Sequence, residues 1–276
     1  YDQYQRVAPR EYKPAPVKIV DIDNESLRRY GQWPWPRSVM AELLAKLREQ
    51  GAASVAMDIV FAEADRTAPS MVFSGWGLQP DDPLTQELTT QVHDPDTVFA
   101  EEIAKGRAVV GVAMTESTTN YEVLRKAGLS KFGGAGLKAE DYLVDYSGAI
   151  ASLPMFQEAA TGVGSINTVY DRDGIVRRVP LLVNLNGKIY PSLAAEALRV
   201  AMGEKNYAVK VSGAQGTWLI GWREGIVDFA IGKAGNLPIK TDPAAQVWLR
   251  DTGSRPERYV PAWKVLEGKA DLGGNI

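Results

Sequence analysis

Carboxylates follow two apolar runs near the start of the chain, and a turn rich in tryptophan and proline lies between the runs. The first run ends in Asp21 and Asp23, and the second contains Asp58. Acidic groups beside tryptophan faces suit a cationic or amine ligand, or a hydrated divalent ion. One candidate ligand site therefore combines Asp21, Asp23, Trp33, Trp35, Arg37 and Asp58.

The elements that must position these residues are predicted to be a strand, a helix and a second strand. Residues 17–22 form a short apolar run without alternation, which is typical of a strand covered on both faces. Pro36 suits the first position of a helix, and Gly51 suits the residue just past its end. Residues 55–61 return to an extended apolar pattern. The helix would bury one stripe made of Val39, Met40, Leu43, Leu44 and Leu47.

This order of elements predicts that the acidic strand ends meet. A strand–helix–strand crossover is almost always right-handed and joins parallel strands, so the carboxyl ends of the two strands should lie side by side. Ligands of open α/β sheets bind at that edge. We expect the three aspartates to converge there, with Arg37 beside them and the two tryptophans as an aromatic wall. Each aspartate also has an ordinary alternative role, because an aspartate after a strand often caps the next helix or pairs with an arginine.

A catalytic alternative starts from the Asp-x-Asp pattern at residues 21–23. It resembles the first motif of haloacid-dehalogenase-like phosphatases, in which the first aspartate is the nucleophile and the second is the acid/base. Magnesium-dependent phosphoryl transfer would also need a metal-binding carboxylate cluster and a cation for the phosphoryl oxygens. Glu25 stands where that family has threonine or valine, and no later aspartate pair follows a strand in the required order. A phosphatase that uses Asp21 and Asp23 is therefore the less favoured interpretation.

The composition argues against several classes of function. The 276 residues are 45% hydrophobic and 24% charged, which is the balance of a folded globular chain. With 31 Lys and Arg against 34 Asp and Glu, the net charge of -3 gives no electrostatic reason to expect nucleic acid as a partner. The lack of cysteine removes thiol catalysis and cysteine-ligated zinc, and it is compatible with an oxidising compartment. His93 is the single histidine, so a multi-histidine metal site is excluded, and we expect no metal or other cofactor.

The middle of the chain continues the alternation of helix and strand. Residues 96–106 predict a helix with one apolar stripe, and residues 107–114 predict another apolar strand. Before and after these elements, residues 62–94 and 115–148 are rich in glycine, proline and polar residues, so they are interpreted as long loop insertions.

The later part of the chain predicts a β-hairpin and one more long helix. Asp171-Arg172-Asp173-Gly174 is interpreted as a tight turn, because no third aspartate or closing glutamate follows at the spacing of a calcium loop. A helix opening at Pro191 would turn one stripe inward, made of Leu193, Ala194, Ala197, Leu198 and Ala201. The expected fold is a single α/β domain with a mixed, mainly parallel sheet flanked by helices, preceded by an extended tether over residues 1–16.

Several segments together resemble the second type of CHASE domain, a family of cyclase- and histidine-kinase-associated sensory extracellular domains of bacterial receptors. The Trp-Pro-Trp-Pro-Arg turn and the Asp-Arg-Asp-Gly hairpin are specific in combination, whereas either alone would be weak. The likeness covers nearly the whole chain. The segments that carry it are residues 21–23, 31–37, 57–61, 171–181, 190–194 and 260–263.

The resemblance implies an extracytoplasmic sensory domain whose enzyme lies elsewhere. In the family the domain lies outside the cytoplasmic membrane, between one membrane helix and further helices that lead to an adenylate or diguanylate cyclase, a histidine kinase or a protein kinase. We therefore expect residues 17–276 to form a sensory domain on the periplasmic side of the bacterial cytoplasmic membrane. It would be tethered to the membrane in the parent receptor and would act as a homodimer.

The resemblance leaves the stimulus and the end of the domain open. The stimulus is a small molecule, an ion or a periplasmic protein, and a domain that only docks a protein is the third alternative to a ligand sensor and a phosphatase. The last strand of the family, an apolar run ending in Gly-Ala-Thr, would follow Gly274. We therefore expect one more apolar strand to complete the domain.

Overall fold

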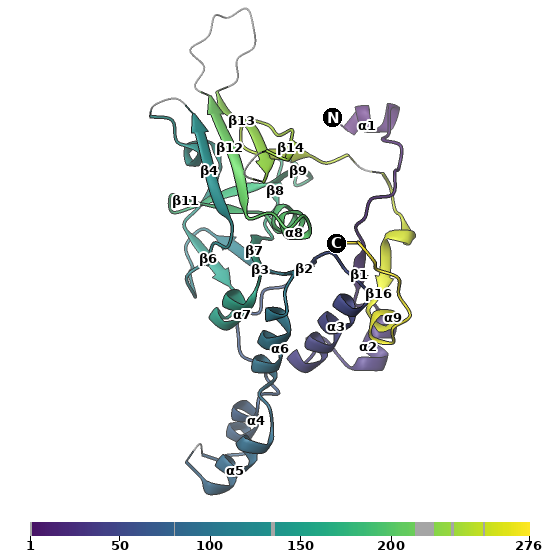
Figure 1. Cartoon of the computed structure of the whole chain (residues 1–276), viewed down its shortest axis with the longest axis vertical. Helices are drawn as coiled ribbons and strands as arrows, with labels where there is room; N and C mark the ends of the chain where they lie inside the picture. Colours follow the sequence, from purple (N-terminus) through teal and green to yellow (C-terminus); the bar gives the residue numbers. More distant parts are fainter. Residues whose placement is uncertain (1, 80, 134–135, 213–223, 233–234, 251) are drawn as a thin grey trace, which may run out of the picture.

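The computed structural model describes residues 2–79, 81–133, 136–212, 224–232, 235–250 and 252–276. The predicted fold class is confirmed, because the chain folds into mixed sheets flanked by helices (Figure 1). The helices are α1 (Asp2–Val7), α2 (Asn24–Tyr30), α3 (Arg37–Glu49), α4 (Pro69–Gly75), α5 (Pro83–Gln91), α6 (Pro95–Ala104), α7 (Pro154–Ala159), α8 (Leu193–Ala201) and α9 (Ala262–Leu266). The strands of the first half are β1 (Ile19–Asp21), β2 (Val55–Met57), β3 (Ala108–Thr115), β4 (Gly128–Gly133), β5 (Val144–Tyr146), β6 (Gly148–Ala151) and β7 (Gly162–Ser165). Those of the second half are β8 (Val169–Tyr170), β9 (Val176–Pro180), β10 (Leu182–Leu185), β11 (Lys188–Pro191), β12 (Asn206–Ser212), β13 (Gly225–Ile231), β14 (Leu237–Ile239), β15 (Gln246–Trp248) and β16 (Tyr259–Pro261).

Strand β3 is the centre of the sheet that positions the site. Its first half pairs in parallel with β2 and with β7, and its second half pairs antiparallel with β6. Because β2 and β7 both pair with Val109 and Val110, they must lie on opposite edges of β3. Helix α8 contacts β2, β3 and β7, and α3, α6 and α7 pack side by side in the lower half of Figure 1.

Helix α3 buries four of the five residues of the predicted apolar stripe, and the fifth, Val39, is partly buried against the same core. Met40, Leu43, Leu44 and Leu47 are all buried, and burial of a side chain of this size stabilises a fold by about 1.5–3 kcal/mol. Gly51 follows the helix with a φ of 83°, the left-handed conformation expected after a helix end. The first core of the protein therefore forms where the sequence pattern places it.

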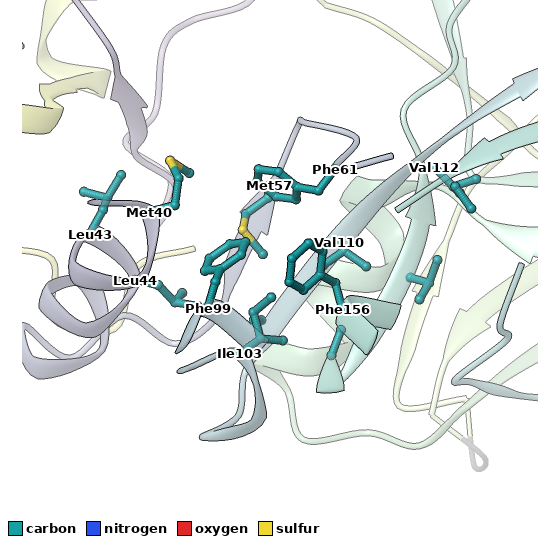
Figure 2. Close-up of a cluster of buried hydrophobic side chains, with 14 of the residues drawn as sticks. Met40, Leu43, Leu44, Met57, Phe61, Phe99, Ile103, Val110, Val112 and Phe156 are labelled. Atoms are coloured by element: carbon teal, nitrogen blue, oxygen red, sulfur yellow. The ribbon is translucent and has the colours of Figure 1, made fainter. Parts of the chain in front are cut away.

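Three phenylalanines from distant segments meet in this core (Figure 2). Phe61, Phe99 and Phe156 pack edge to face, with ring centroids 5.1 to 5.9 Å apart. All three rings are buried, together with Ile103 of α6. Edge-to-face packing of this kind adds about 0.5–1.5 kcal/mol per pair to the burial itself, so this contact helps to join α6 and α7 to the strands.

Strand β1 does not pair with β2. It pairs in parallel with β16, a strand that lies near the other end of the chain. Helices α2 and α9 pack together beside this two-stranded sheet (Figure 1). The unit of strand, helix and strand is therefore present, but its two strands are separate in the described structure, which corrects the expectation that they lie side by side.

A second core lies under the sheet of order β14-β13-β12-β4. The predicted hairpin is confirmed as β8 and β9, which pair antiparallel around residues 171–174. A second hairpin joins β10 and β11, and its turn residues Asn186 and Gly187 both have positive φ, as a two-residue hairpin turn requires.

Three segments contain more regular structure than predicted. Residues 62–94 form α4 and α5, each with a proline in its first turn, where the missing N–H costs no hydrogen bond. Residues 115–148 contain β4 and β5, which find their partners in β12 and β10. The first segment, residues 1–16, includes the short helix α1. Within the residues described, the helices are too short or too polar to cross a bilayer.

Candidate ligand site

A cavity of about 780 Å³ lies between β1 and β2, and we refer to it as the β1–β2 cavity. The two strands supply two of its sides, α3 supplies apolar side chains, and residues near the C-terminus also line it. Its apolar lining includes Val20, Ile22, Met40, Leu43, Leu44 and Met57. Ligand sites are typically concave and mostly apolar with a few polar groups, so this cavity has the general properties of one.

Both strands begin at the same end of the β1–β2 cavity. Just before β1, the N–H of Ile276 donates to the carbonyl of Pro16 at 2.9 Å, and the N–H of Lys18 donates to the carbonyl of Ile276 at 2.9 Å. Just before β2, the N–H of Ala53 donates to the carbonyl of Asn275 at 2.7 Å. The C-terminal residues thus bridge the starts of β1 and β2, and the carboxyl ends of both strands lie toward the opposite end.

Three of the six predicted residues, Asp21, Trp33 and Asp58, line this cavity, and we call them the acidic rim. Asp21 ends β1 and Asp58 follows β2, and both side chains are exposed. Across the described part of the chain, neither carboxylate forms an ion pair. Trp33 is 37% exposed and meets the ring of Trp35 edge-on at 6.2 Å. The rim therefore offers two carboxylates and an accessible indole to a ligand.

Asp23 caps a helix, which is the ordinary alternative role considered for each of the three aspartates. It is the N-cap of α2, and its Oδ1 accepts hydrogen bonds from the backbone N–H of Ser26 at 2.8 Å and from the Ser26 hydroxyl at 2.7 Å. These hydrogen bonds favour the ionised carboxylate and lower the pKa of Asp23. Its bonds to Ser26 hold Asp23 at the helix start, and it does not line the β1–β2 cavity.

Trp35 belongs to the core, unlike Trp33. Its side chain is 1% exposed, and its Nε1–H donates to the carbonyl of Gly31 at 2.8 Å. The ring also packs against Tyr30, with 5.9 Å between the ring centroids. The two tryptophans of the turn therefore differ in role, because one anchors the turn and the other is left at the mouth of the cavity.

Arg37 lies in a charge cluster at the base of residues 62–94 instead of at the rim. Its Nε is 3.5 Å from Oδ1 of Asp96, its backbone N–H donates to Asp65, and its guanidinium lies 4.6 Å from the centre of the Phe61 ring. Burial lowers the pKa of Arg37 and raises the pKa of Asp96. This arrangement fixes the start of α3 against the segment that carries α4 and α5.

A buried polar cluster that includes two residues of α8 was not predicted from the sequence. Glu196 is fully buried and binds Arg199 through two hydrogen bonds of 2.6 and 2.9 Å, while the hydroxyl of Tyr207 donates to Glu196 at 2.6 Å. Arg199 also donates to the carbonyls of Thr161 and Glu204 at 3.0 and 2.6 Å. Since these charges satisfy one another inside the protein, we assign the cluster to stability.

The Asp-Arg-Asp-Gly hairpin turn also has a structural explanation. Arg177 forms ion pairs with Asp171 at 3.0 Å, with Asp173 at 2.7 Å and with Asp2 of α1 at 2.5 Å. The hydrogen bond from Arg177 lowers the pKa of Asp173 to about 2. The guanidinium of Arg177 therefore neutralises the aspartates of the turn, and its ion pair with Asp2 links α1 to the hairpin. Within the described residues, no group of three or more acidic, histidine or cysteine side chains has the geometry to hold a metal ion.

An apolar cavity with a few polar groups at its mouth is what a ligand-recognising domain requires. Comparison with protein families identifies the class of this domain, because the sequence model of the CHASE2 domain family matches residues 1–275. The chain belongs to the CHASE2 family, which consists of extracellular sensory domains of receptors and not of enzymes. No curated protein and no solved structure matches the chain.

Proposed function

We propose that this chain is the stimulus-recognising domain of a bacterial transmembrane receptor, on the periplasmic side of the cytoplasmic membrane. Membership of the CHASE2 family supports the sensory role and the extracellular location. In this proposal the receptor is a homodimer, and its output is an adenylate or diguanylate cyclase, or a histidine or protein kinase. The chain itself binds a stimulus and leaves the chemistry to that output domain.

The acidic rim is the observation that carries the choice of ligand. Asp21 and Asp58 are exposed at the mouth of an apolar cavity, and the indole of Trp33 lies with them along its lining. A cationic amine fits this set, because the carboxylates attract its charge and an indole face binds a cation by about 0.5–2 kcal/mol. Its apolar part would enter the cavity beside Ile22 and Met57. We therefore propose an amine with an apolar body as the stimulus.

The position of the rim gives binding a way to become a signal. A stimulus shifts a conformational equilibrium only if it binds one state better than the other. Asp21 and Asp58 belong to separate sheets, because β1 pairs with β16 and β2 pairs with β3. A ligand that contacts both carboxylates would draw these sheets together, and β1 directly follows the N-terminal segment of the chain.

The test is a titration of the purified chain with choline and with spermidine, followed by its thermal unfolding. A ligand that binds only the folded state adds about 2.7 kcal/mol to the free energy of unfolding at 100 times its dissociation constant. The temperature of the unfolding midpoint therefore rises with ligand concentration. We expect this rise in the unmodified chain and in Asp81→Asn, which removes an exposed carboxylate outside the cavity. We expect it to be lost in Trp33→Ala and in the double variant Asp21→Asn with Asp58→Asn.

Two results would contradict the amine-binding rim. One is an unchanged unfolding midpoint of the unmodified chain at millimolar concentrations of both probes. The other is an equal rise in the rim variants and in Asp81→Asn, since that would mean unspecific attraction to an acidic protein. Sedimentation of the chain with and without the effective probe tests the proposed homodimer in the same samples.

A further inference from the structure

Three positively charged side chains from separate segments line another cavity, of about 510 Å³, which we call the basic cavity. Arg10 comes from the segment before β1, Lys240 follows β14, and Arg250 follows β15. All three residues are exposed, and none of them forms an ion pair among the described residues. Like charges gathered around one cavity repel one another, so an anion bound there would be stabilised by all three.

Asp242 also lines the basic cavity, but its carboxylate already has partners. Its Oδ1 accepts hydrogen bonds from the backbone N–H of Ala244 at 2.9 Å and from that of Gln246 at 2.8 Å. Its Oδ2 lies 3.8 Å from Nη1 of Arg178. Asp242 therefore closes the turn before β15, and its charge is shared with a fourth cation instead of neutralising the three that line the cavity.

Contacts on both sides of Arg10 hold its segment against later parts of the chain. Before it, Asp2 forms an ion pair with Arg177 of β9 at 2.5 Å. After it, the guanidinium of Arg255 lies 4.8 Å from the centre of the Tyr12 ring. The basic cavity therefore lies between two parts of the chain that are already in contact, and an anion inside it would join Arg10 to the residues that flank β15.

Two neutral side chains of the basic cavity favour a ligand larger than a simple ion. Gln246 is buried, and its Oε1 has no hydrogen-bond partner among the described residues. A buried polar atom without a partner is costly, and a hydroxyl group of a ligand would remove that cost by donating to it. Trp248 is 45% exposed and offers an apolar ring to the carbon atoms of a ligand. The volume also falls in the range of about 300–1,000 Å³ that is typical of small-molecule sites.

We propose that the basic cavity binds a phosphate group whose carrier has hydroxyl groups, as in glycerol phosphate. Arginine presents N–H donors in a planar fork that fits phosphate oxygens, and lysine adds a point charge. The three cationic side chains hold the phosphate, and a hydroxyl group of the carrier donates to Gln246. Two sources carry this chemistry, which are free glycerol 3-phosphate and the headgroup of phosphatidylglycerol in a bilayer.

The test measures binding of glycerol 3-phosphate to the chain of 276 residues by titration calorimetry, with glycerol as the probe that lacks the phosphate. We expect saturable binding of the phosphate ester alone, and weaker binding at high salt because the charges are exposed. The double variant Lys240→Gln with Arg250→Gln should bind at least about tenfold more weakly, because each hydrogen bond from a charged group contributes about that factor.

A matched control removes two positive charges elsewhere. Arg125→Gln with Lys138→Gln changes the net charge by the same amount at two exposed positions outside the basic cavity, so its affinity should equal that of the unmodified chain. An equal loss in both double variants would overturn the proposal, because the attraction would then be unspecific. Binding of glycerol as strong as that of its phosphate ester would overturn it too.

Flotation with vesicles distinguishes the two sources of the phosphate. Vesicles of phosphatidylcholine are compared with vesicles that also contain phosphatidylglycerol. Binding of the free ester identifies a soluble ligand, whereas retention on the phosphatidylglycerol vesicles alone, lost in Lys240→Gln with Arg250→Gln, identifies a lipid headgroup. The proposal is wrong if the unmodified chain binds neither the ester nor these vesicles. Asp21→Asn with Asp58→Asn should leave both measurements unchanged, so their outcome is separate from that of the proposed amine-binding rim.

Discussion

The sheet around β3 has two edges, and they are built in opposite ways. At the closed edge, β7 is buried along its whole length and α8 packs against it. At the open edge, β2 borders the β1–β2 cavity. Both edges flank the same central strand, so the difference between them comes from the elements that pack against β7 and against β2.

The closed edge is covered by helix α8, which packs directly on β7. A Cβ atom added at Gly164 of β7 would lie 2.6 Å from the Cα of Leu193, so only glycine lets α8 approach this closely. Behind it, Glu196, Arg199 and Tyr207 satisfy one another by hydrogen bonds. Burial raises the pKa of Tyr207, and the neighbouring Glu196 carboxylate raises it further.

The comparison distinguishes an edge whose polar groups are paired and buried from an edge that borders a cavity. Buried polar groups stabilise a fold only when every one of them is paired, and the closed edge meets that condition. The open edge instead combines two strands that each have one partner in the described structure, an apolar lining, and two carboxylates without an ion pair among the described residues. Substitutions at the closed edge should therefore affect folding, and substitutions at the open edge should affect binding.

The largest effect is expected from Glu196→Ala at the closed edge. The variant would leave the buried Arg199 without its carboxylate and the Tyr207 hydroxyl without its acceptor. Breaking a buried ion pair by removing one partner costs about 3–5 kcal/mol, because the remaining charge is uncompensated. The free energy of unfolding, measured with urea, should fall by that amount.

A matched control separates this loss from the removal of any glutamate. Glu158→Ala removes an exposed carboxylate from α7, and its unfolding free energy should stay within about 0.5 kcal/mol of the unmodified chain. If Glu196→Ala were as stable as Glu158→Ala, the cluster would not be what completes the closed edge.

The next effect is expected from Gly164→Ala, which tests the close approach of α8. The added methyl group would meet the backbone of Leu193, and a backbone cannot move aside as a flexible side chain can. Overpacking of this kind costs about 1–3 kcal/mol. Gly75→Ala on α4 is the control, because nothing lies within 4 Å of its added Cβ, and it should leave the unfolding midpoint unchanged or slightly raised. Equal stability of the two variants would contradict close packing as the reason for glycine in β7.

The open edge could be predicted from local sequence to a large extent. The periodicity of α3 and the acidic ends of the two strands were readable from the sequence, and Asp21, Asp58 and Trp33 do line one cavity, although the two strands do not lie side by side as the prediction assumed. The pairing of β1 with β16 was not predictable, because it joins segments almost the whole chain apart and local periodicity does not specify a partner. The same limit applies to β4 and β12, which pair across a long interval.

The closed edge and the other site residues show why residue type alone misleads. The apolar stripe predicted for α8 was largely wrong, because only Ala197 of its five residues is buried. Glu196 and Arg199 are buried instead, and each neutralises the charge of the other, which lies one helical turn away. Trp35 and Arg37 look like ligand-binding residues but are used in the core and in an ion pair with Asp96. A charged residue inside an apolar helical stripe is the signal that points to such pairs.

The smallest effect is expected from Asp23→Ala, at the start of the helix beside the open edge. Removing an N-cap aspartate costs about 0.5–2 kcal/mol, because the first N–H groups of α2 lose their acceptor. The hydrogen bonds from Ser26 lower the pKa of Asp23 in the folded state, so this contribution is complete above the unfolded pKa of about 3.9 and is lost as the pH falls through the lower folded value. Urea unfolding of the unmodified chain and of Asp23→Ala at pH 7 and at about pH 2 should therefore show a difference in unfolding free energy that is smaller in acid.

Asp23→Asn, which keeps an acceptor without a titrating group, should have an unfolding free energy close to that of the unmodified chain at pH 7. A gap of the same size at both pH values would mean that Asp23 acts through something other than its ionised cap, and the ordinary role that separates it from Asp21 and Asp58 would then have to be given up.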